Sequence, residues 1–519
     1  MNTILPIWLA SLSLGASWAT KSLVAEPASA AFPALRQKLA DTLQATGANQ
    51  GWWGVSAVCV ENGVSVFATN DSRHFVPASS TKLYTVGLAL NRLGGDYRIR
   101  TSAFAESLPD AQGVLHGDLA IVGRGDPTLS TQFRTGNGSL AETSLIESIK
   151  KSGIKSVEGR LVVDGSWLRA APYGSGWEWD DMVEGYAAPV SALTLGDNVS
   201  RVAAVPGSRA GDSARLNWQS GNLLLNVENR IVTRTADERA PVIEYQRMPG
   251  SNRLYLRGTI PLGAGPWSAE IASPQPEQWF ATQLRAQLEK SGISIAQSNL
   301  VISATAESPW RTGPWKELAG VDSPPVSDIA ALTLKPSQNL YAQLLLLHVG
   351  EEALKKQRAS ETNQTPDLEA MGIRELNRWV GSLGIATGDV AIEEGSGLSR
   401  RNLVTPRATI RLLRYMATNQ WHETWMKSLP VGGIDGTLQK RFIDGPARGK
   451  VHAKTGSLRS IQALAGYVTT AGGQTVAFAL YANQFTPTDT AAARKTIDQW
   501  VEVLAAYSGR IEEPPGAKN

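Results

Sequence analysis

The chain has 519 residues, of which 42% are hydrophobic and 19% are charged. This length allows two to four domains, and the composition is typical of a globular protein rather than a disordered one. Basic and acidic residues nearly balance at 50 against 47, with no polybasic run, which argues against a nucleic-acid partner. The single cysteine, Cys59, excludes an intrachain disulfide and a cysteine zinc site, and we expect it to be buried filler rather than a reactive thiol.

The N-terminus has the pattern of a secretory signal. An apolar stretch from Ile4 to Ala19 is followed by small residues that include Ala28-Ser29-Ala30. We predict a signal peptide over residues 1–30, with cleavage after Ala19 as the alternative, although no Lys or Arg precedes the apolar stretch. No later segment is apolar enough to span a bilayer. We therefore expect an exported protein of the periplasm or cell envelope, with no integral membrane segment in the mature chain.

The first elements after this signal are a hairpin and a helix. Residues 54–60 and 64–70 alternate in hydrophobicity around Glu-Asn-Gly, which predicts a β-hairpin. In the following stretch, VPASSTKLYTVGLAL (76–90), apolar residues recur at helical spacing and Gly94-Gly95 end the pattern. Ser79 is thus predicted at or near the first turn of an amphipathic helix.

The hydrophobicity pattern changes from about residue 100 to 305. Short runs of alternating apolar and polar residues predict a β-rich block there, with helices at 140–151 and 277–291. Residues 306–327 contain four prolines and are predicted to be a linker. The rest of the chain is predicted to contain helices at 338–349, 366–384, 406–418 and 488–507, with three strands between 449 and 483.

Ser79 and Lys82 form an S-x-x-K pair. Residues three apart face the same side of a helix, so the hydroxyl and the amine can meet. Partial burial and a second cation would lower the pKa of such a lysine enough for it to act as a base. The backbone N–H of Ser79 at a helix start is half of an oxyanion hole. The pair alone is weak evidence, because an ordinary helix start carries the same residue types.

Ser337-Gln338-Asn339 opens a second predicted helix. Ser337 can relay a proton and Asn339 can donate to a substrate amide, although Ser is also a common helix N-cap.

Lys454-Thr455-Gly456-Ser457 lies at the end of a predicted strand. Lys454 and Thr455 can hold a substrate carboxylate, and Gly456 lets another backbone approach. The Ser457 N–H can complete the oxyanion hole. The alternative is a strand-to-turn junction with an exposed lysine.

The three segments occur in the order S-x-x-K, S-x-N, K-T-G, which is the motif set of β-lactamases and penicillin-binding proteins, with Gln338 in place of the usual Asp. The five histidines give no support for a Ser-His-Asp triad and none lies in a zinc motif. Acyl transfer through Ser79 needs no metal or cofactor, so none is expected.

The sequence resembles the class C low-molecular-mass penicillin-binding proteins, the D-alanyl-D-alanine carboxypeptidases/endopeptidases of peptidase family S13 (penicillin-binding-protein-4 type). The long segment between Ser79 and Ser337 is much shorter in class A β-lactamases and small carboxypeptidases. Further blocks that resemble the family are LHGDLAIVGRGDPTLS (115–130), GWEWDDMVEGYAAPVSALTLGDN (176–198), EEGSGLSRRNLVTP (393–406) and LPVGGIDGTLQKRF (429–442).

The resemblance implies an α+β fold of the three-layer type: a β-lactamase/transpeptidase-like domain with an antiparallel sheet flanked by helices, a helical lobe and β-rich insertion domains. The expected division is 1–30 signal peptide, 31–105 first part of the transpeptidase-like domain, 106–195 insertion domain II, 196–267 nested insertion domain III, 268–320 return of domain II, 321–510 second part of the transpeptidase-like domain and 511–519 tail.

The implied activity is cleavage of D-Ala-D-Ala in peptidoglycan stem peptides and of cross-links, with acylation of Ser79 by the substrate or by β-lactam inhibitors. Family members also recognise a diaminopimelate side chain, and Asp181, Tyr186 and Arg400 fall at the corresponding positions. The alternative is a structural ion pair and a core aromatic. Arg459 stands where some relatives carry Gln, which bears on side-chain preference.

Two rival functions remain at this point. A β-lactamase would need a deacylating base, and Glu375-Leu376-Asn377 has the wrong spacing for the class A motif. A non-catalytic peptidoglycan-binding homologue would retain the motifs without activity.

Overall fold

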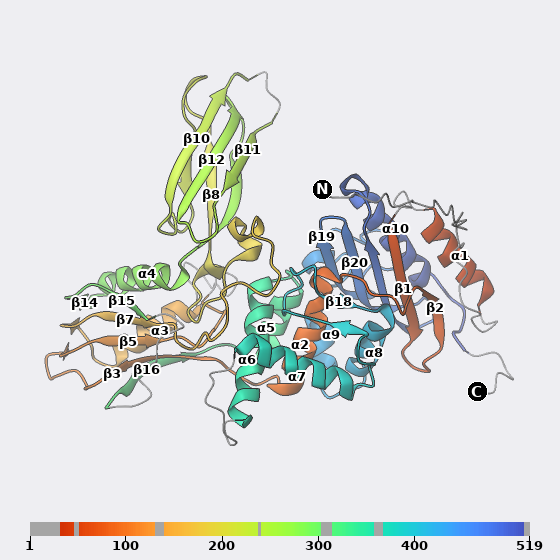
Figure 1. The fold of residues 1–519 in the computed structure, drawn as a ribbon, viewed down its shortest axis with the longest axis horizontal. Helices are drawn as coiled ribbons and strands as arrows, with labels where there is room; N and C mark the ends of the chain where they lie inside the picture. The colour runs from red at the N-terminus through yellow and green to blue at the C-terminus, as the bar shows by residue number, and fades with distance from the viewer. Residues whose placement is uncertain are drawn as a thin grey trace, which may run out of the picture.

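The protein is described by a computed structural model that covers residues 32–45, 51–129, 140–236, 240–302, 314–357 and 367–512. The predicted signal peptide lies outside the described residues, as does all of the tail except its first two residues. Figure 1 shows a compact body of sheet and helices at one end, a second sheet-containing unit at the other, and a β-rich arm that rises from the second unit.

The body is built on a five-stranded antiparallel sheet in the order β19-β20-β21-β1-β2. The predicted hairpin and the three predicted C-terminal strands are confirmed, and they share this one sheet. Residues of β20 and β21 are buried almost throughout, which explains their nearly continuous apolar sequence. The strand bounds are Trp52–Cys59 (β1), Ser65–Thr69 (β2), Val451–Leu458 (β19), Ile461–Thr469 (β20) and Thr475–Asn483 (β21).

Helices cover both faces of this sheet, so the predicted α+β fold is confirmed. One face packs against α1 and α10, where Leu39 and Trp500 are fully buried. The other face packs against α8 and then the helical lobe. Sequence periodicity missed α1, α5 and α9, each of which is short or only partly amphipathic. The helix bounds are Pro33–Gln44 (α1), Thr81–Arg92 (α2), Val326–Leu334 (α5), Asn339–Gln357 (α6), Leu368–Ser382 (α7), Pro406–Met416 (α8), His422–Ser428 (α9) and Thr490–Ala505 (α10).

The chain enters the inserted unit through one strand and leaves it through another, and these two strands pair with each other. β3 (Arg100–Ala105) and β16 (Lys316–Asp322) pair antiparallel at one edge of the sheet β15-β7-β5-β3-β16. The prediction of a linker over 306–327 is therefore wrong for β16, whose proline-free sequence is flanked by the prolines that suggested a linker. β3 itself belongs to this sheet, although the expected division assigned residues up to 105 to the transpeptidase-like domain.

The remaining elements of this unit cover its sheet and extend it. Both predicted helices are confirmed, as α3 and α4. The bounds are Val114–Leu115 (β4), Leu119–Val122 (β5), Leu140–Lys151 (α3), Ser156–Val157 (β6), Leu161–Asp164 (β7), Pro276–Lys290 (α4), Ser294–Ile295 (β14) and Leu300–Ile302 (β15).

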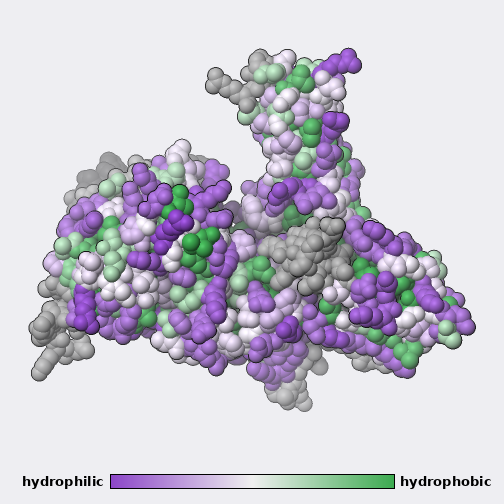
Figure 2. Space-filling model, turned by 180° about the vertical axis from the view of Figure 1, so that it is seen from behind, coloured by the Kyte–Doolittle hydropathy of each residue, from purple (hydrophilic) through white to green (hydrophobic). Residues whose placement is uncertain are grey.

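The β-rich arm consists of two three-stranded sheets with a core of their own. Seen from behind in Figure 2, it stands out as a separate lobe with a mixed polar and apolar surface. Its first sheet is β13-β8-β9 and its second is β10-β12-β11. The bounds are Val199–Val205 (β8), Arg215–Trp218 (β9), Asn226–Arg234 (β10), Val242–Gln246 (β11), Arg253–Pro261 (β12) and Trp267–Ala272 (β13). Within the described residues, no helix is both long and apolar enough to cross a bilayer.

Candidate active site

Ser79 lies in η1 (Ala78–Ser80), a single 3-10 turn that leads directly into α2. The structure thus places it immediately before the predicted helix. The backbone around it is tightly constrained, because Ala78 has a φ of 48° and its carbonyl faces Gly397. A Cβ atom at Gly397, which has a φ of +88°, would overlap that carbonyl oxygen. The Gly397 loop therefore helps to fix the position of the Ser79 turn.

Lys82 meets Ser79 as the i, i+3 spacing predicts. Its Nζ donates to Ser79 Oγ at 2.9 Å, to Asn339 Oδ1 at 2.5 Å and to the Ser396 carbonyl at 2.6 Å. An ammonium has three N–H donors, and each finds one of these acceptors. The amine is thus held in one orientation, with the hydroxyl of Ser79 as one of its three neighbours.

Burial changes the protonation of this amine. Lys82 has no exposed surface, and its burial lowers the pKa to about 7 against the opposing attraction of the Glu394 carboxylate. At neutral pH a large share of Lys82 is therefore the free amine, which is the form that can accept the proton of Ser79.

A second buried lysine contacts the second motif. Lys454 Nζ donates to Ser337 Oγ at 2.8 Å and to the carbonyl of Thr455 at 2.8 Å. Burial is the main cause that lowers the pKa of Lys454 well below its usual range, and the charge of Lys82 adds to it. The sequence alternative of an exposed lysine at a strand-to-turn junction is wrong, because Lys454 is fully buried.

Ser337 and Asn339 lie where the chain turns into α6. Ser337 has a φ of 68°, so it adopts the left-handed conformation rather than that of a regular helix. Asn339 accepts from Lys82 and donates through Nδ2 to the Tyr186 carbonyl at 2.8 Å. Its amide is thus shared between the lysine and the inserted unit, whereas from sequence we expected it to assist proton transfer and to hold the substrate backbone.

The K-T-G motif lies on β19, which is the edge strand of the central sheet. Thr455 Oγ1 donates to Thr437 Oγ1 at 2.8 Å, and Ser457 Oγ accepts from Gln462 Nε2 at 2.6 Å. A Cβ atom at Gly456 would overlap the carbonyl oxygen of Pro77, so glycine lets the Ser79 turn pack directly against the strand. An edge strand leaves main-chain groups free to pair with an extended peptide.

The structure adds a buried carboxylate that the motifs did not identify. Glu394 has no exposed surface and accepts hydrogen bonds from the backbone N–H groups of Ser396 and Gly397 and from the Asn402 side chain. It also accepts from the Ser396 hydroxyl and the Trp177 indole. This network orients the Ser396 carbonyl that receives Lys82. The only sequence signal for it was the block EEGSGLSRRNLVTP, read for its family resemblance.

The predicted side-chain recognition residues gather at the rim of this site. The Tyr186 hydroxyl donates to Asp181 Oδ1 at 2.5 Å, and burial is the main cause that raises the pKa of Asp181. Arg400 donates to Glu178 at 3.0 Å and to the carbonyl of Arg459 at 3.1 Å. These contacts form within the rim itself, and half of Tyr186 remains exposed.

A polar pocket of about 310 Å³ adjoins the second motif. Ser337 and Asn339 line it from the body, Tyr186 lines it from the inserted unit, and the Arg201–Glu270 ion pair lines it from the arm. The pocket therefore offers space and hydrogen-bonding groups beside Ser337, on the side of the inserted unit.

Comparisons with known proteins identify the family of this chain. The model of the D-Ala-D-Ala carboxypeptidase 3 (S13) family matches residues 35–507. A D-alanyl-D-alanine carboxypeptidase of Actinomadura sp. (strain R39) is 29% identical, with 97% of this chain and 90% of that protein covered. A D-alanyl-D-alanine carboxypeptidase DacB of Haemophilus influenzae is 27% identical, with 81% and 83% covered. The crystal structure of penicillin binding protein 4 from H. influenzae superposes with a TM-score of 0.74 at 25% identity, covering 89% of this chain and 99% of that one.

Proposed function

The chain belongs to the D-Ala-D-Ala carboxypeptidase 3 (S13) family, and from this we propose that it is a serine-type D-Ala-D-Ala carboxypeptidase with Ser79 as its nucleophile. The observation that carries the assignment of the site is the 2.9 Å contact between Ser79 Oγ and the amine of Lys82, whose pKa burial lowers to about 7. The hydrogen-bonded pair Ser337–Lys454 comes from other parts of the chain, and the charge of Lys82 acts on Lys454. These contacts support the roles of nucleophile for Ser79, base for Lys82 and proton relay for Ser337.

Acylation begins with the free amine of Lys82 taking the proton of Ser79. The Ser79 oxygen attacks the carbonyl carbon of the penultimate D-Ala, and the backbone N–H groups of Ser79 and Ser457 stabilise the resulting oxyanion. The peptide C–N bond then breaks. The proton taken by Lys82 is relayed through Ser337, which is hydrogen-bonded to Lys454, to the departing amine. Free D-Ala leaves, and Lys82 is again the free amine.

Deacylation reverses these roles. Water attacks the ester carbonyl and gives its proton to the amine that took the proton of Ser79. Lys82 returns this proton to the Ser79 oxygen as the ester bond breaks, and the shortened stem peptide is released. No metal or cofactor enters either step. The same residues are available when the leaving group is the amine of a cross-link, so we include endopeptidase activity as a second reaction of the same site.

The proposed substrate is a peptidoglycan stem peptide in the periplasm or cell envelope. Lys454 and Thr455 would bind its terminal carboxylate, Gly456 would allow its backbone to pair along β19, and Asn339 would hold its amide. Asp181 and Arg400 at the rim would recognise the ammonium and carboxylate of its third side chain, with Tyr186 against the aliphatic part and Arg459 tuning the preference. β-Lactams present the same acyl group and carboxylate, and their opened ring stays attached, so they would inhibit by stable acylation.

A contact of Glu375 adds to the argument from spacing against this residue as the deacylating base of a β-lactamase. Glu375 pairs with Arg92 at 2.6 Å, at the C-terminal end of α2. Arg92 is ten residues beyond Lys82, a rise of about 15 Å along the helix, so Glu375 does not reach the ester.

Labelling with fluorescent penicillin tests the proposal. The purified protein is incubated with the probe and the modified peptide is mapped, with Ser79→Ala as the control, while D-Ala release from a pentapeptide is measured in parallel. We expect persistent label on Ser79 and none on the variant. Label on another residue would overturn the site, rapid turnover of a chromogenic β-lactam would favour the β-lactamase, and no D-Ala release would favour the non-catalytic homologue.

A further inference from the structure

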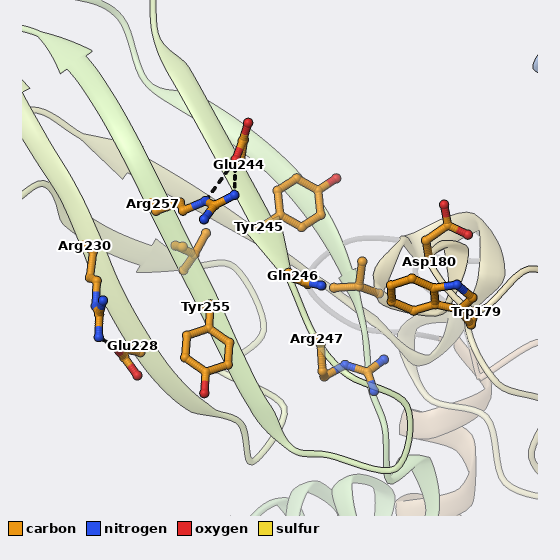
Figure 3. Close-up of a pocket in the computed structure, with 12 residues that line it drawn as sticks. Trp179, Asp180, Glu228, Arg230, Glu244, Tyr245, Gln246, Arg247, Tyr255 and Arg257 are labelled. Carbon is orange, nitrogen blue, oxygen red and sulfur yellow. Dashed lines mark hydrogen bonds and ion pairs between the residues drawn. The ribbon is translucent and has the colours of Figure 1, made fainter.

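A second groove adjoins the segment that carries the rim residue Asp181. It has a volume of about 500 Å³ and lies between the sheet β10-β12-β11 of the arm and the segment 179–183 of the inserted unit. Figure 3 shows the two sides: the sheet contributes tyrosines and arginines, and Trp179 and Asp180 face them from the other wall. This volume is in the range of ligand-binding clefts.

One arginine in the groove lacks the partner that its neighbours have. Arg230 pairs with Glu228 and Arg257 pairs with Glu244, as the dashed lines in Figure 3 mark. Arg247 is 3% exposed, and no carboxylate of the described residues lies within ion-pair distance of it.

The contacts of Arg247 satisfy it only in part. Its guanidinium donates to the Met182 carbonyl at 2.5 Å and to the Ser251 carbonyl at 3.4 Å, and its Nε has no hydrogen-bond partner in the described structure. A buried cation without a counter-charge is costly, so an anion that enters the groove gains from it. A carboxylate is the anion whose shape best fits a guanidinium.

The opposite wall offers an aromatic surface. Trp179 is 53% exposed, an unusual state for a tryptophan. In Figure 3 the Asp180 carboxylate points away from Arg247, on the other side of the indole, so it does not neutralise the guanidinium. The Tyr255 ring lies 5.1 Å from the Arg253 guanidinium and adds a further aromatic surface to the sheet wall. Amphipathic rings of this kind suit a ligand with both apolar faces and hydroxyl groups.

The chain that runs from this wall through residues 179–186 also reaches the candidate active site. Its Tyr186 carbonyl accepts from Asn339, while its Met182 carbonyl accepts from Arg247 and its Glu184 carboxylate accepts from the Tyr245 hydroxyl. One short segment thus separates two binding surfaces. A polymeric substrate held at Ser79 can continue across the rim into the groove.

We propose that the groove between Trp179 and Arg247 binds the glycan strand of peptidoglycan, with a sugar ring against Trp179 and a carboxylate of the strand's muramyl-peptide portion at Arg247. The inference rests on the proposed function for the identity of the polymer. It makes the groove a second subsite that favours polymeric over free peptide substrate.

Two measurements on the full-length mature protein test this. The first is binding to insoluble peptidoglycan by variants that also carry Ser79→Ala, so that no turnover occurs. The second is the ratio of kcat/KM for a disaccharide-linked pentapeptide to kcat/KM for the free pentapeptide, in the presence of Ser79. The variants are Trp179→Ala and Arg247→Met, and Trp52→Ala is the matched control because Trp52 is a similarly exposed tryptophan on β1.

We expect Trp179→Ala to weaken binding to peptidoglycan and to lower the kcat/KM ratio by about fivefold to tenfold, as for an anchor residue of an interface. Arg247→Met should act in the same direction, and Trp52→Ala should change neither.

Competition by a neutral N-acetylglucosamine oligomer would identify the sugar contact, and competition by free stem peptide alone would overturn the glycan assignment. Unchanged binding and an unchanged ratio for Trp179→Ala, a surface change that leaves folding intact, would also overturn it. Failure of the proposed function would appear separately, as absence of D-Ala release with binding to peptidoglycan retained.

Discussion

Glu394→Gln tests whether the buried carboxylate positions Lys82, the proposed base. In the native site one carboxylate oxygen accepts from the Gly397 N–H and the Asn402 side chain, and the other accepts from the N–H and hydroxyl of Ser396. A glutamine has one acceptor oxygen and one N–H₂ group. Whichever way it is turned, the backbone N–H of either Ser396 or Gly397 then faces another donor.

The magnitude follows from these contacts. A buried donor left unsatisfied costs about 1–3 kcal/mol, and replacing a charged acceptor by a neutral one at the remaining contacts costs about 1 kcal/mol more. We therefore expect destabilisation by about 2–4 kcal/mol, concentrated in the loop whose carbonyl receives Lys82. Because the negative charge of Glu394 raises the pKa of Lys82, its removal should also shift the acid limb of the acylation profile to lower pH.

The assay is the rate of labelling by fluorescent penicillin as a function of pH, together with the midpoint of thermal unfolding. Glu393→Gln is the matched control, because the Glu393 carboxylate is 44% exposed and contacts Arg401 at 3.5 Å. Such a surface pair contributes about 0–1 kcal/mol. If Glu394→Gln labelled and unfolded like Glu393→Gln, the argument that Glu394 holds the Ser396 carbonyl against Lys82 would be refuted.

Three further outcomes follow from the same geometry. Acylation should be half-maximal near pH 7 and fall at lower pH, because protonated Lys82 cannot accept the proton of Ser79; a rate independent of pH between about 5 and 8 would contradict this. Gly456→Ala should slow acylation by at least about tenfold, because its Cβ displaces the Pro77 turn, whereas Gly381→Ala, which meets nothing within 4 Å on α7, should be neutral; equal labelling rates would count against the constraint. Cys59, whose pKa burial raises to about 11, should react with thiol reagents only after unfolding, and labelling of the native protein would contradict its burial.

The local part of the site was predictable from sequence. Ser79 and Lys82 meet because residues three apart share a helix face, and this requires nothing beyond the helix that the apolar spacing of residues 83–93 predicts. The contact of Ser337 with Lys454 is different in kind. The chain order of the three motifs predicted it through a known pattern, and no periodicity of the sequence itself encodes the approach of two segments so far apart.

Other features could not be predicted, for identifiable reasons. A glutamate in a Gly- and Ser-rich loop has the composition of an exposed turn, and only the fold shows that Glu394 is buried beneath its own loop. β16 lies between prolines, and a strand whose pairing partner β3 lies more than 200 residues earlier carries no local signal of that pairing. From sequence we expected Asn339 to contact the substrate. Its hydrogen bond to the Tyr186 carbonyl could not be predicted, because the position of Tyr186 depends on how the inserted unit packs.

The insertion between the first two motifs is part of the active site rather than an addition to it. Gln338 donates to Asp197 at 3.0 Å, Tyr341 donates to the same carboxylate at 2.9 Å, and Asn339 donates to the Tyr186 carbonyl. Three contacts thus anchor the start of α6 to residues of the inserted unit. Because Asn339 also holds Lys82, the orientation of the proposed base depends on a segment more than 100 residues away in sequence. A polymer that engages the arm therefore lies one short segment from Asn339, which holds the proposed base.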